Sequence, residues 1–233
     1  MEKCKLIDAA IDLRYLLDRG YKRERVLDII VERYLLDRKE RSAIYRCIHS
    51  TEEALKTIAK LVVRSELLAL DLFNSLITLL AMIEGDQVYL CDDCLARDVR
   101  GSKIRSCDEP HLIKAISMLA ELVSFCKPRE LIIVAEKQIS NSIFIAKSLQ
   151  AYLGLSTLCR IDIVDRVDSR LIELCKEGFT VASTDIVILR ECKSVYPLTT
   201  IALMSFGYRP RIDFASIFNI KCFNLITALL DRG

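Results

Sequence analysis

The fold is decided by two stretches of sequence, Leu67-Leu-Ala-Leu-Asp-Leu-Phe-Asn74 and Val88-Tyr-Leu-Cys-Asp-Asp-Cys-Leu-Ala-Arg-Asp98. Each contains a short apolar run that stops at a carboxylate, which is Asp71 in the first stretch and the pair Asp92 and Asp93 in the second. Apolar runs of this length between turn-forming residues are typical of buried parallel strands, because such strands are apolar on both faces.

The same pattern recurs three times downstream, where apolar runs end at Glu136, Asp165 and Asp185. The predicted strands are 67–70, 88–91, 131–135, 158–164 and 179–183, with a further candidate at 195–203 and a closing helix at 214–230. Helical patterns separate the runs. This alternation predicts an α/β fold with a mainly parallel, Rossmann-like sheet and helices on both faces.

The first part of the chain is predicted to be a helical bundle, with helices at 4–19 and 23–36, a third helix that Asp37 caps, and a fourth that starts at Ser50 or Thr51 and runs through Leu61. Asp37 and Glu40 have the spacing of a capping box at the start of the third helix. We therefore divide the chain into a helical domain, residues 1–65, and an α/β domain, residues 66–233. Residues 1–65 hold 15 Lys/Arg against 11 Asp/Glu, whereas the remainder holds 19 against 21.

The third helix carries Arg38, Arg41 and Arg46, and short helices with a basic third member resemble a helix-turn-helix arrangement. The sequence therefore allows two interpretations of the helical domain. It binds nucleic acid through these arginines, or its basic residues form an ordinary solvated face.

Composition and motifs argue against several classes of protein. Apolar residues make up 52% of the 233 residues, which is enough for a sizeable core, and no apolar stretch is long enough to span a bilayer. Asp8 and Asp12 interrupt the apolar stretch that a signal peptide needs, so we expect a cytoplasmic protein with no membrane segment. Neither GxxxxGK[ST] nor GxGxxG occurs, which argues against an ATPase or a dehydrogenase. The oligomeric state is not determined by these features.

The acidic strand ends predict a metal site. The carboxyl ends of parallel strands lie at one edge of a sheet, where ligands bind. Asp71, Asp93 and Asp185 are the preferred ligands, for one or two Mg²⁺ or Mn²⁺ ions, because hard cations prefer carboxylate oxygens. Such a site would activate water for attack on a phosphate. An N-cap role for each aspartate is the alternative, although capping does not explain Asp92 and Asp93 together.

Other side chains near these strand ends complete the candidate site. Asn74 would orient a ligand or the scissile phosphate, and Arg97 could contact that phosphate bidentately. Asp92 and Asp98 are secondary choices, either as metal ligands or as partners of Arg97. The segment Ser140-Asn141-Ser142 could bind phosphate through backbone amides, or simply cap the next helix.

The cysteines and histidines offer a second metal pattern. Cys91-x-x-Cys94 followed by Cys107-x-x-x-His111 has spacing that could hold zinc. We expect no zinc, because Cys91 closes a predicted buried strand. The ten cysteines are expected to be mainly buried thiols rather than a disulfide framework. His49 has no carboxylate partner nearby in the sequence, so it receives no catalytic role.

The N-terminal residues carry a family resemblance. The stretches 7–21 and 37–46 closely resemble an uncharacterised, largely archaeal family that joins a small helical domain of unknown function to an equally uncharacterised C-terminal domain. The C-terminal segments of that family look like those of PIN-like (NYN-like) metal-dependent ribonucleases. Its Asp-Gly-Tyr-Asn corresponds to Asp71-Leu-Phe-Asn74, and its Asp-Asp-Gly-x-x-Arg-Asp to Asp92-Asp-Cys-Leu-Ala-Arg-Asp98.

Two further segments extend this resemblance, a Ser-Asn-Ser segment at 140–142 and a Thr-Ser-Asp segment that corresponds to Ser183-Thr184-Asp185. Leu72 and Cys94 replace two family glycines, which restricts the backbone at these positions. The resemblance implies a PIN-like domain that hydrolyses RNA with Mg²⁺ or Mn²⁺. The alternative is a non-catalytic RNA-binding or adaptor protein with a degenerate PIN-like domain.

Overall fold

A computed structural model of the chain describes residues 2–100, 104, 109–154 and 157–231. Its parallel sheet consists of β1 (Leu67–Asp71), β4 (Glu130–Glu136), β5 (Leu158–Val164) and β6 (Thr180–Ala182), in the order β5-β4-β1-β6. All three strand pairs are parallel, with Leu68 opposite both Leu131 and Thr180. The predicted α/β class with a mainly parallel sheet is therefore confirmed.

The order of the strands creates a reversal in the direction of the chain. From β1 the chain adds β4 and then β5 on one side, and it then returns across the sheet to place β6 on the other side of β1. The helix α7 (Ser142–Leu153) packs on β4 and β5, and α8 (Val167–Lys176) packs on β1, β4 and β6. Right-handed crossovers place these two helices on opposite faces. The carboxyl ends of β1 and β6 thus meet at a topological switch point, where open α/β sheets bind ligands.

The second predicted strand does not join this sheet. The strands β2 (Val88–Leu90) and β3 (Ala96–Asp98) form a separate antiparallel hairpin. A tight turn connects them, in which the Cys91 amide donates to the Leu95 carbonyl at 3.0 Å and Cys94 has a φ of 66°. The prediction of a parallel strand at 88–91 was wrong, because a short apolar run does not identify the partner of a strand.

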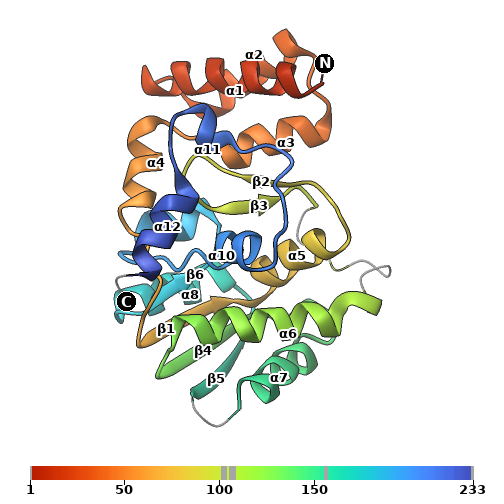
Figure 1. Ribbon diagram of the computed structural model, residues 1–233, viewed down its shortest axis with the longest axis vertical. Coiled ribbons are helices and arrows are strands. Elements are labelled where there is room, and N and C mark those ends of the chain that lie inside the picture. The colour runs from red at the N-terminus through yellow and green to blue at the C-terminus, as the bar shows by residue number, and fades with distance from the viewer. Residues whose placement is uncertain (1, 101–103, 105–108, 155–156, 232–233) are drawn as a thin grey trace.

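Four helices precede the sheet: α1 (Glu2–Asp18), α2 (Arg23–Tyr34), α3 (Arg38–Cys47) and α4 (Thr51–Ile58). The capping box at α3 is confirmed, because Glu40 N donates to Asp37 Oδ1 at 2.8 Å and Asp37 N to Glu40 Oε2 at 2.9 Å. The apolar core of these helices also includes Tyr89 and Phe214, whose rings stack at 5.7 Å. The hairpin therefore lies between the first three helices and the parallel sheet (Figure 1).

The remaining helices surround the sheet and form the end of the chain. They are α5 (Leu72–Ile83), α6 (Glu109–Cys126), α9 (Ile186–Glu191), α10 (Leu198–Ser205), α11 (Phe214–Ile217) and α12 (Cys222–Leu230). The predicted strand at 195–203 was wrong: only single bridges form at Val195, and Pro197 then begins α10. The predicted helix at 214–230 divides into two, with Asn219 between them at a φ of 60°.

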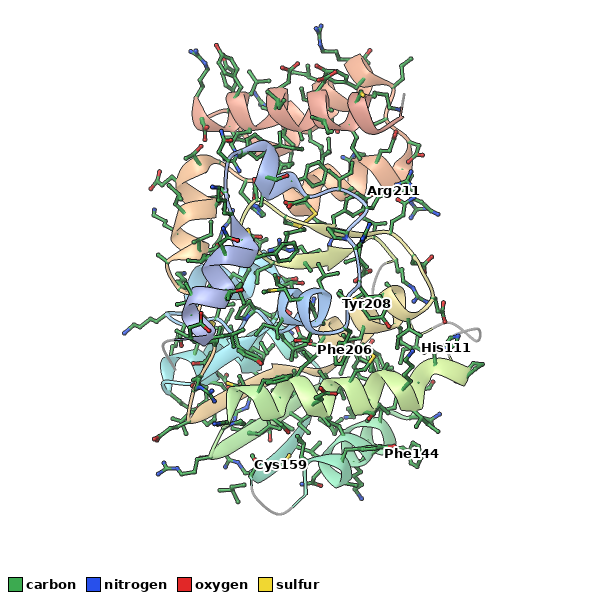
Figure 2. The ribbon with its side chains drawn as sticks, viewed as in Figure 1. His111, Phe144, Cys159, Phe206, Tyr208 and Arg211 are labelled. Carbon is green, nitrogen blue, oxygen red and sulfur yellow. A yellow bond between two sulfur atoms is a disulfide. The ribbon has the colours of Figure 1, made fainter. Side chains whose placement is uncertain are left out.

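Six cysteines form the disulfides Cys47–Cys91, Cys94–Cys222 and Cys175–Cys192. The expectation of mainly free thiols was therefore wrong, although Cys4, Cys126 and Cys159 are free. The zinc pattern needs free thiols at Cys91 and Cys94. Each of these two cysteines is instead in a disulfide. Cys107 lies outside the described residues, and His111 stands at the start of α6 (Figure 2).

In the described part of the chain, no helix combines the length and the apolar character needed to cross a bilayer.

Candidate functional site at the carboxyl edge of the sheet

A pocket of about 710 Å³ lies at the carboxyl edge of the parallel sheet. Its acidic side comes mainly from the ends of β1, β3 and β4 and from the starts of α8 and α9. Its basic side comes mainly from α2, α3 and the last turn of α9. The charged residues that line it are Arg23, Glu24, Arg46, His49, Asp71, Arg97, Asp98, Glu136, Asp168, Asp185 and Arg190.

The Asp71 carboxylate is at the centre of the acidic side, because Asp71 ends β1 and also caps α5. Its Oδ1 accepts from the Asn74 amide at 3.4 Å, and its Oδ2 accepts from Ser183 Oγ at 2.8 Å. The same serine oxygen accepts from the Asp185 amide at 3.2 Å. One hydroxyl therefore joins Asp71 to the segment that carries Asp185, so two of the three preferred metal ligands meet in one pocket.

The local electrostatics favour a cation. The pKa of Asp71 is raised from 3.8 to about 7, mainly by burial and also by the negative charges of Asp168 and Asp185, against the hydrogen bonds from Ser183 and Asn74. The pKa of Asp168 is also raised, by burial and by Asp185. Carboxylates that raise each other's pKa are relieved by a positive charge between them.

Asn74 positions the loop that follows β6. Its Oδ1 accepts from both the amide and the hydroxyl of Thr184, each at 3.0 Å. The side-chain oxygen is thus engaged with the protein. The contacts that the structure shows for Asn74 hold residues 183–185 beside Asp71.

Asp93, the third preferred ligand, pairs with Arg97 instead of facing the pocket. The two form a bidentate salt bridge, with distances of 2.8 and 2.6 Å, and the Asp93 side chain is completely buried. Burial raises the pKa of Asp93, but the charge and hydrogen bonds of Arg97, together with His49 and the Leu95 amide, outweigh burial and hold this pKa below the ordinary value. Arg97 Nε also donates to the Thr184 carbonyl at 2.9 Å, so the pair supports the segment before Asp185.

The two secondary ligand choices have separate partners. Asp92 is buried and accepts hydrogen bonds from Arg14 and from the backbone and ring of His49. Asp92 and Asp93 are absent from the pocket lining in the described part of the chain, so neither belongs to the cation site that we consider below. Asp98 lines the pocket, but Thr78 Oγ1 and the Arg100 amide each donate to it at 2.8 Å.

Two carboxylates outside the predicted ligand set also line the pocket: Glu136, which the sequence indicates only as an acidic strand end, and Asp168. The position of Glu136 at the end of a predicted strand was a usable signal. Asp168 lies in the first turn of α8, where an acidic residue is ordinary and gives no indication of a site.

The basic side of the pocket depends on one face of α3. Ser42, Tyr45 and Arg46 line it with the i, i+3 and i+4 spacing of a single helical face, and His49 lines it just after the helix ends. Arg46 Nη1 donates to the Asp98 carbonyl at 2.8 Å, and burial lowers the pKa of Arg46.

The other two predicted arginines of α3 lie elsewhere. Arg38 is exposed and Arg41 pairs with Asp28 at 3.1 Å, and neither is among the described residues that line the pocket.

The Ser140-Asn141-Ser142 segment lies next to the pocket, which Ile139 lines. Asn141 is the N-cap of α7 but makes no side-chain capping hydrogen bond, and its φ is 62°. Ser140 and Asn141 are exposed. The structure thus shows neither a side-chain cap nor a place for this segment in the pocket lining.

Two family models match the chain. Residues 62–201 match the family described as Domain of unknown function (DUF5616), and residues 5–60 match the one described as Protein of unknown function (DUF434). The first match covers more than half of the 233 residues. The chain belongs to the DUF5616 family. The prediction of an uncharacterised family is thereby confirmed.

An uncharacterized protein of Methanocaldococcus jannaschii is similar to this DUF5616 protein. It is 30% identical over 196 residues, which cover 82% of this chain and 92% of the relative. No solved structure matches the chain. None of these names states an activity.

Proposed function

We propose that this protein is a metal-dependent ribonuclease whose α/β part, residues 66–233, is a PIN-like domain. The observation that carries the proposal is the convergence of Asp71 and Asp185 through Ser183, at the switch point of a parallel sheet. This is where the resemblance to PIN-like ribonucleases places acidic ligands.

The donor atoms are of the chemical type that Mg²⁺ or Mn²⁺ prefers. Asp71, Asp168 and Asp185 offer carboxylate oxygens to one pocket, and hard divalent cations prefer oxygen ligands. When bound there, such a cation would lower the pKa of water and stabilise charge on a reacting phosphate. The raised pKa of Asp71 supports the assignment, because burial and like charges leave this carboxylate in need of a positive partner.

The opposite side of the pocket suits a single nucleic-acid strand. Arg46 makes no salt bridge to any described residue, and its guanidinium can contact a phosphate. Tyr45 is 44% exposed at the same pocket and offers an aromatic face for a base. In this proposal the helical part, residues 1–65, supplies the RNA-binding side through the inner face of α3.

The two lost family glycines are compatible with the proposed site. Cys94 adopts a φ of 66°, the left-handed backbone conformation that a glycine favours, and its side chain is held by Cys222. Leu72 is fully buried in the first turn of α5, directly after Asp71. At Cys94 the backbone thus keeps the conformation that a glycine favours, and at Leu72 the larger side chain adds apolar packing.

Incubation of the purified full chain with labelled single-stranded RNA tests the proposal. We expect cleavage with Mn²⁺ or Mg²⁺ and none with EDTA. If the protein binds the RNA but no divalent cation supports cleavage, the non-catalytic RNA-binding alternative replaces the proposal. If it neither binds nor cleaves RNA, both are wrong.

RNA affinity should depend on Arg46 and not on Arg38. Replacing Arg46 with glutamine removes one of the cations that line the pocket, so we expect about tenfold weaker binding, equivalent to about 1.4 kcal/mol. The matched Arg38→Gln variant loses a charge from the same helix outside the pocket and should bind within about twofold of the unchanged protein. Fluorescence anisotropy with EDTA measures both affinities without cleavage. Equal losses in the two variants would indicate a general charge effect, contrary to this placement of the RNA.

A further inference from the structure

His49 and Asp92 form a buried dyad beside the pocket. His49 Nδ1 lies 2.6 Å from Asp92 Oδ1, and the His49 amide donates to Asp92 Oδ2 at 2.7 Å. Because a carboxylate accepts, Nδ1 carries a proton. The other ring nitrogen, Nε2, has no hydrogen-bond partner among the described residues, and the side chain is 3% exposed in a residue that lines the pocket.

Several contacts fix the position of the dyad. The Asp92 amide donates to the Cys47 carbonyl at 3.1 Å, and the Cys47–Cys91 disulfide joins the same two segments. Arg14 donates to Asp92, and its guanidinium lies 3.9 Å from the centre of the Phe218 ring. The imidazole is thus held by its backbone and by Nδ1, which leaves Nε2 as the ring atom available to a ligand.

We infer that His49 donates a proton to the leaving ribose oxygen during RNA hydrolysis, an inference that rests on the proposed function. The oxygen of a water forms a bond to phosphorus while the bond from phosphorus to the ribose oxygen breaks. The leaving oxygen takes the Nε2 proton of the imidazolium, and the attacking water gives its proton to solvent. Solvent then returns a proton to Nε2, so the net reaction is hydrolysis. The Asp92 carboxylate keeps Nδ1–H in place and stabilises the imidazolium.

The position of His49 favours a role at the leaving oxygen rather than at the attacking water. In phosphoryl transfer the attacking and leaving oxygens lie roughly in line on either side of phosphorus. Asp71 and Asp185 belong to the sheet edge, whereas His49 follows α3 on the side that carries Arg46. A phosphate between these two sides would have the carboxylates on one side and the imidazole on the other.

Two substrates distinguish proton donation from a structural role. The His49→Asn variant keeps a side-chain N–H donor near the Nδ1 position and removes Nε2, and His49→Gln is a second variant in case the first fails to fold. Activity is measured with Mn²⁺ on single-stranded RNA and on bis(4-nitrophenyl) phosphate. The nitrophenolate leaves without a proton. We expect RNA cleavage to fall by about 100-fold or more and cleavage of the activated diester by less than about threefold.

The control variant is Lys39→Gln, which changes an exposed residue of α3 that is not among the described residues lining the pocket, and it should leave both rates within about twofold. Equal losses of the His49 variants on both substrates, or no loss on either, overturn the inference while RNA cleavage by the unchanged protein still supports the proposed function. Failure of the unchanged protein to cleave RNA overturns both. Circular dichroism confirms that the compared variants are folded.

Discussion

Replacing Asp71 with asparagine should lower the rate of Mn²⁺-dependent RNA cleavage by about 1,000-fold or more, which corresponds to about 4 kcal/mol of activation free energy. Asparagine can still accept from the Asn74 amide and contact Ser183, so the local structure is retained. The negative charge that would hold the cation is lost. Single-turnover cleavage of labelled RNA measures the effect.

Asp213→Asn is the matched control for this variant. Asp213 also caps a helix, accepting from the Ser216 amide at 2.9 Å, but it is not among the described residues that line the pocket. We expect its cleavage rate to stay within about twofold of the unchanged protein. Similar rates for the Asp71 variant and this control would show that Asp71 is only a helix cap.

The same Asp71 variant should be more stable than the unchanged protein at high pH. In the unchanged protein, the pKa of Asp71 rises from 3.8 to about 7 on folding. Between pH 3.8 and about pH 7, the folded state therefore holds a proton that the unfolded state has lost. The contribution of the protonated Asp71 to the free energy of unfolding is complete below pH 3.8 and is lost as the pH rises through about 7. Asparagine cannot ionise. Urea unfolding with EDTA should therefore show a gain of up to about 4 kcal/mol at pH 8 and little gain at pH 4. A loss of stability at both pH values would contradict the raised pKa.

Replacing Arg97 with methionine should destabilise the fold by about 3–5 kcal/mol, because it leaves the Asp93 carboxylate buried without its partner. After the substitution, this carboxylate keeps one hydrogen bond from the described residues, which the Leu95 amide donates at 3.2 Å. The bond from Arg97 to the Thr184 carbonyl is also lost, so RNA cleavage should fall as the segment before Asp185 loosens. Urea unfolding at pH 7 measures the change in stability.

The Arg97 prediction has two controls. Arg41→Met breaks an exposed pair with Asp28 and should cost less than about 1 kcal/mol. Adding Asp93→Asn to Arg97→Met removes the uncompensated charge and should restore about 2 kcal/mol. If the Arg97 and Arg41 variants are equally stable, the Asp93–Arg97 pair does not support the fold as described.

The repeated apolar runs were sufficient to predict most of the parallel sheet. Strands predicted at 67–70, 131–135, 158–164 and 179–183 occur close to those bounds, because central parallel strands must be apolar on both faces. The run at 88–91 has the same composition but pairs with 96–98. Its residues Tyr89 and Cys91 pack in the core of the N-terminal helices. Composition shows that a run is buried without showing which neighbour buries it.

The candidate site was predictable only where a residue follows a strand directly. Asp71 ends β1, and Asp185 caps α9 shortly after the neighbouring strand β6, so the pairing of these two strands brings both residues to one pocket. Asp93 follows a hairpin strand, so it turns to Arg97 four residues later. The partner of His49 is Asp92, which is 43 residues away in the chain, so no local pattern could reveal the dyad.

The sequence by itself determined the α/β class, the capping box at Asp37 and the acidic residues at strand ends, because local hydrogen bonds and the periodicity of apolar residues fix these features. Tertiary structure alone decided which charges face each other. The order β5-β4-β1-β6 brings Asp185 to Asp71, and the packing of α3 over the hairpin brings Arg46 and His49 to the same pocket. Contacts between distant segments depend on how whole elements pack, and that packing is not encoded in the residues next to each side chain.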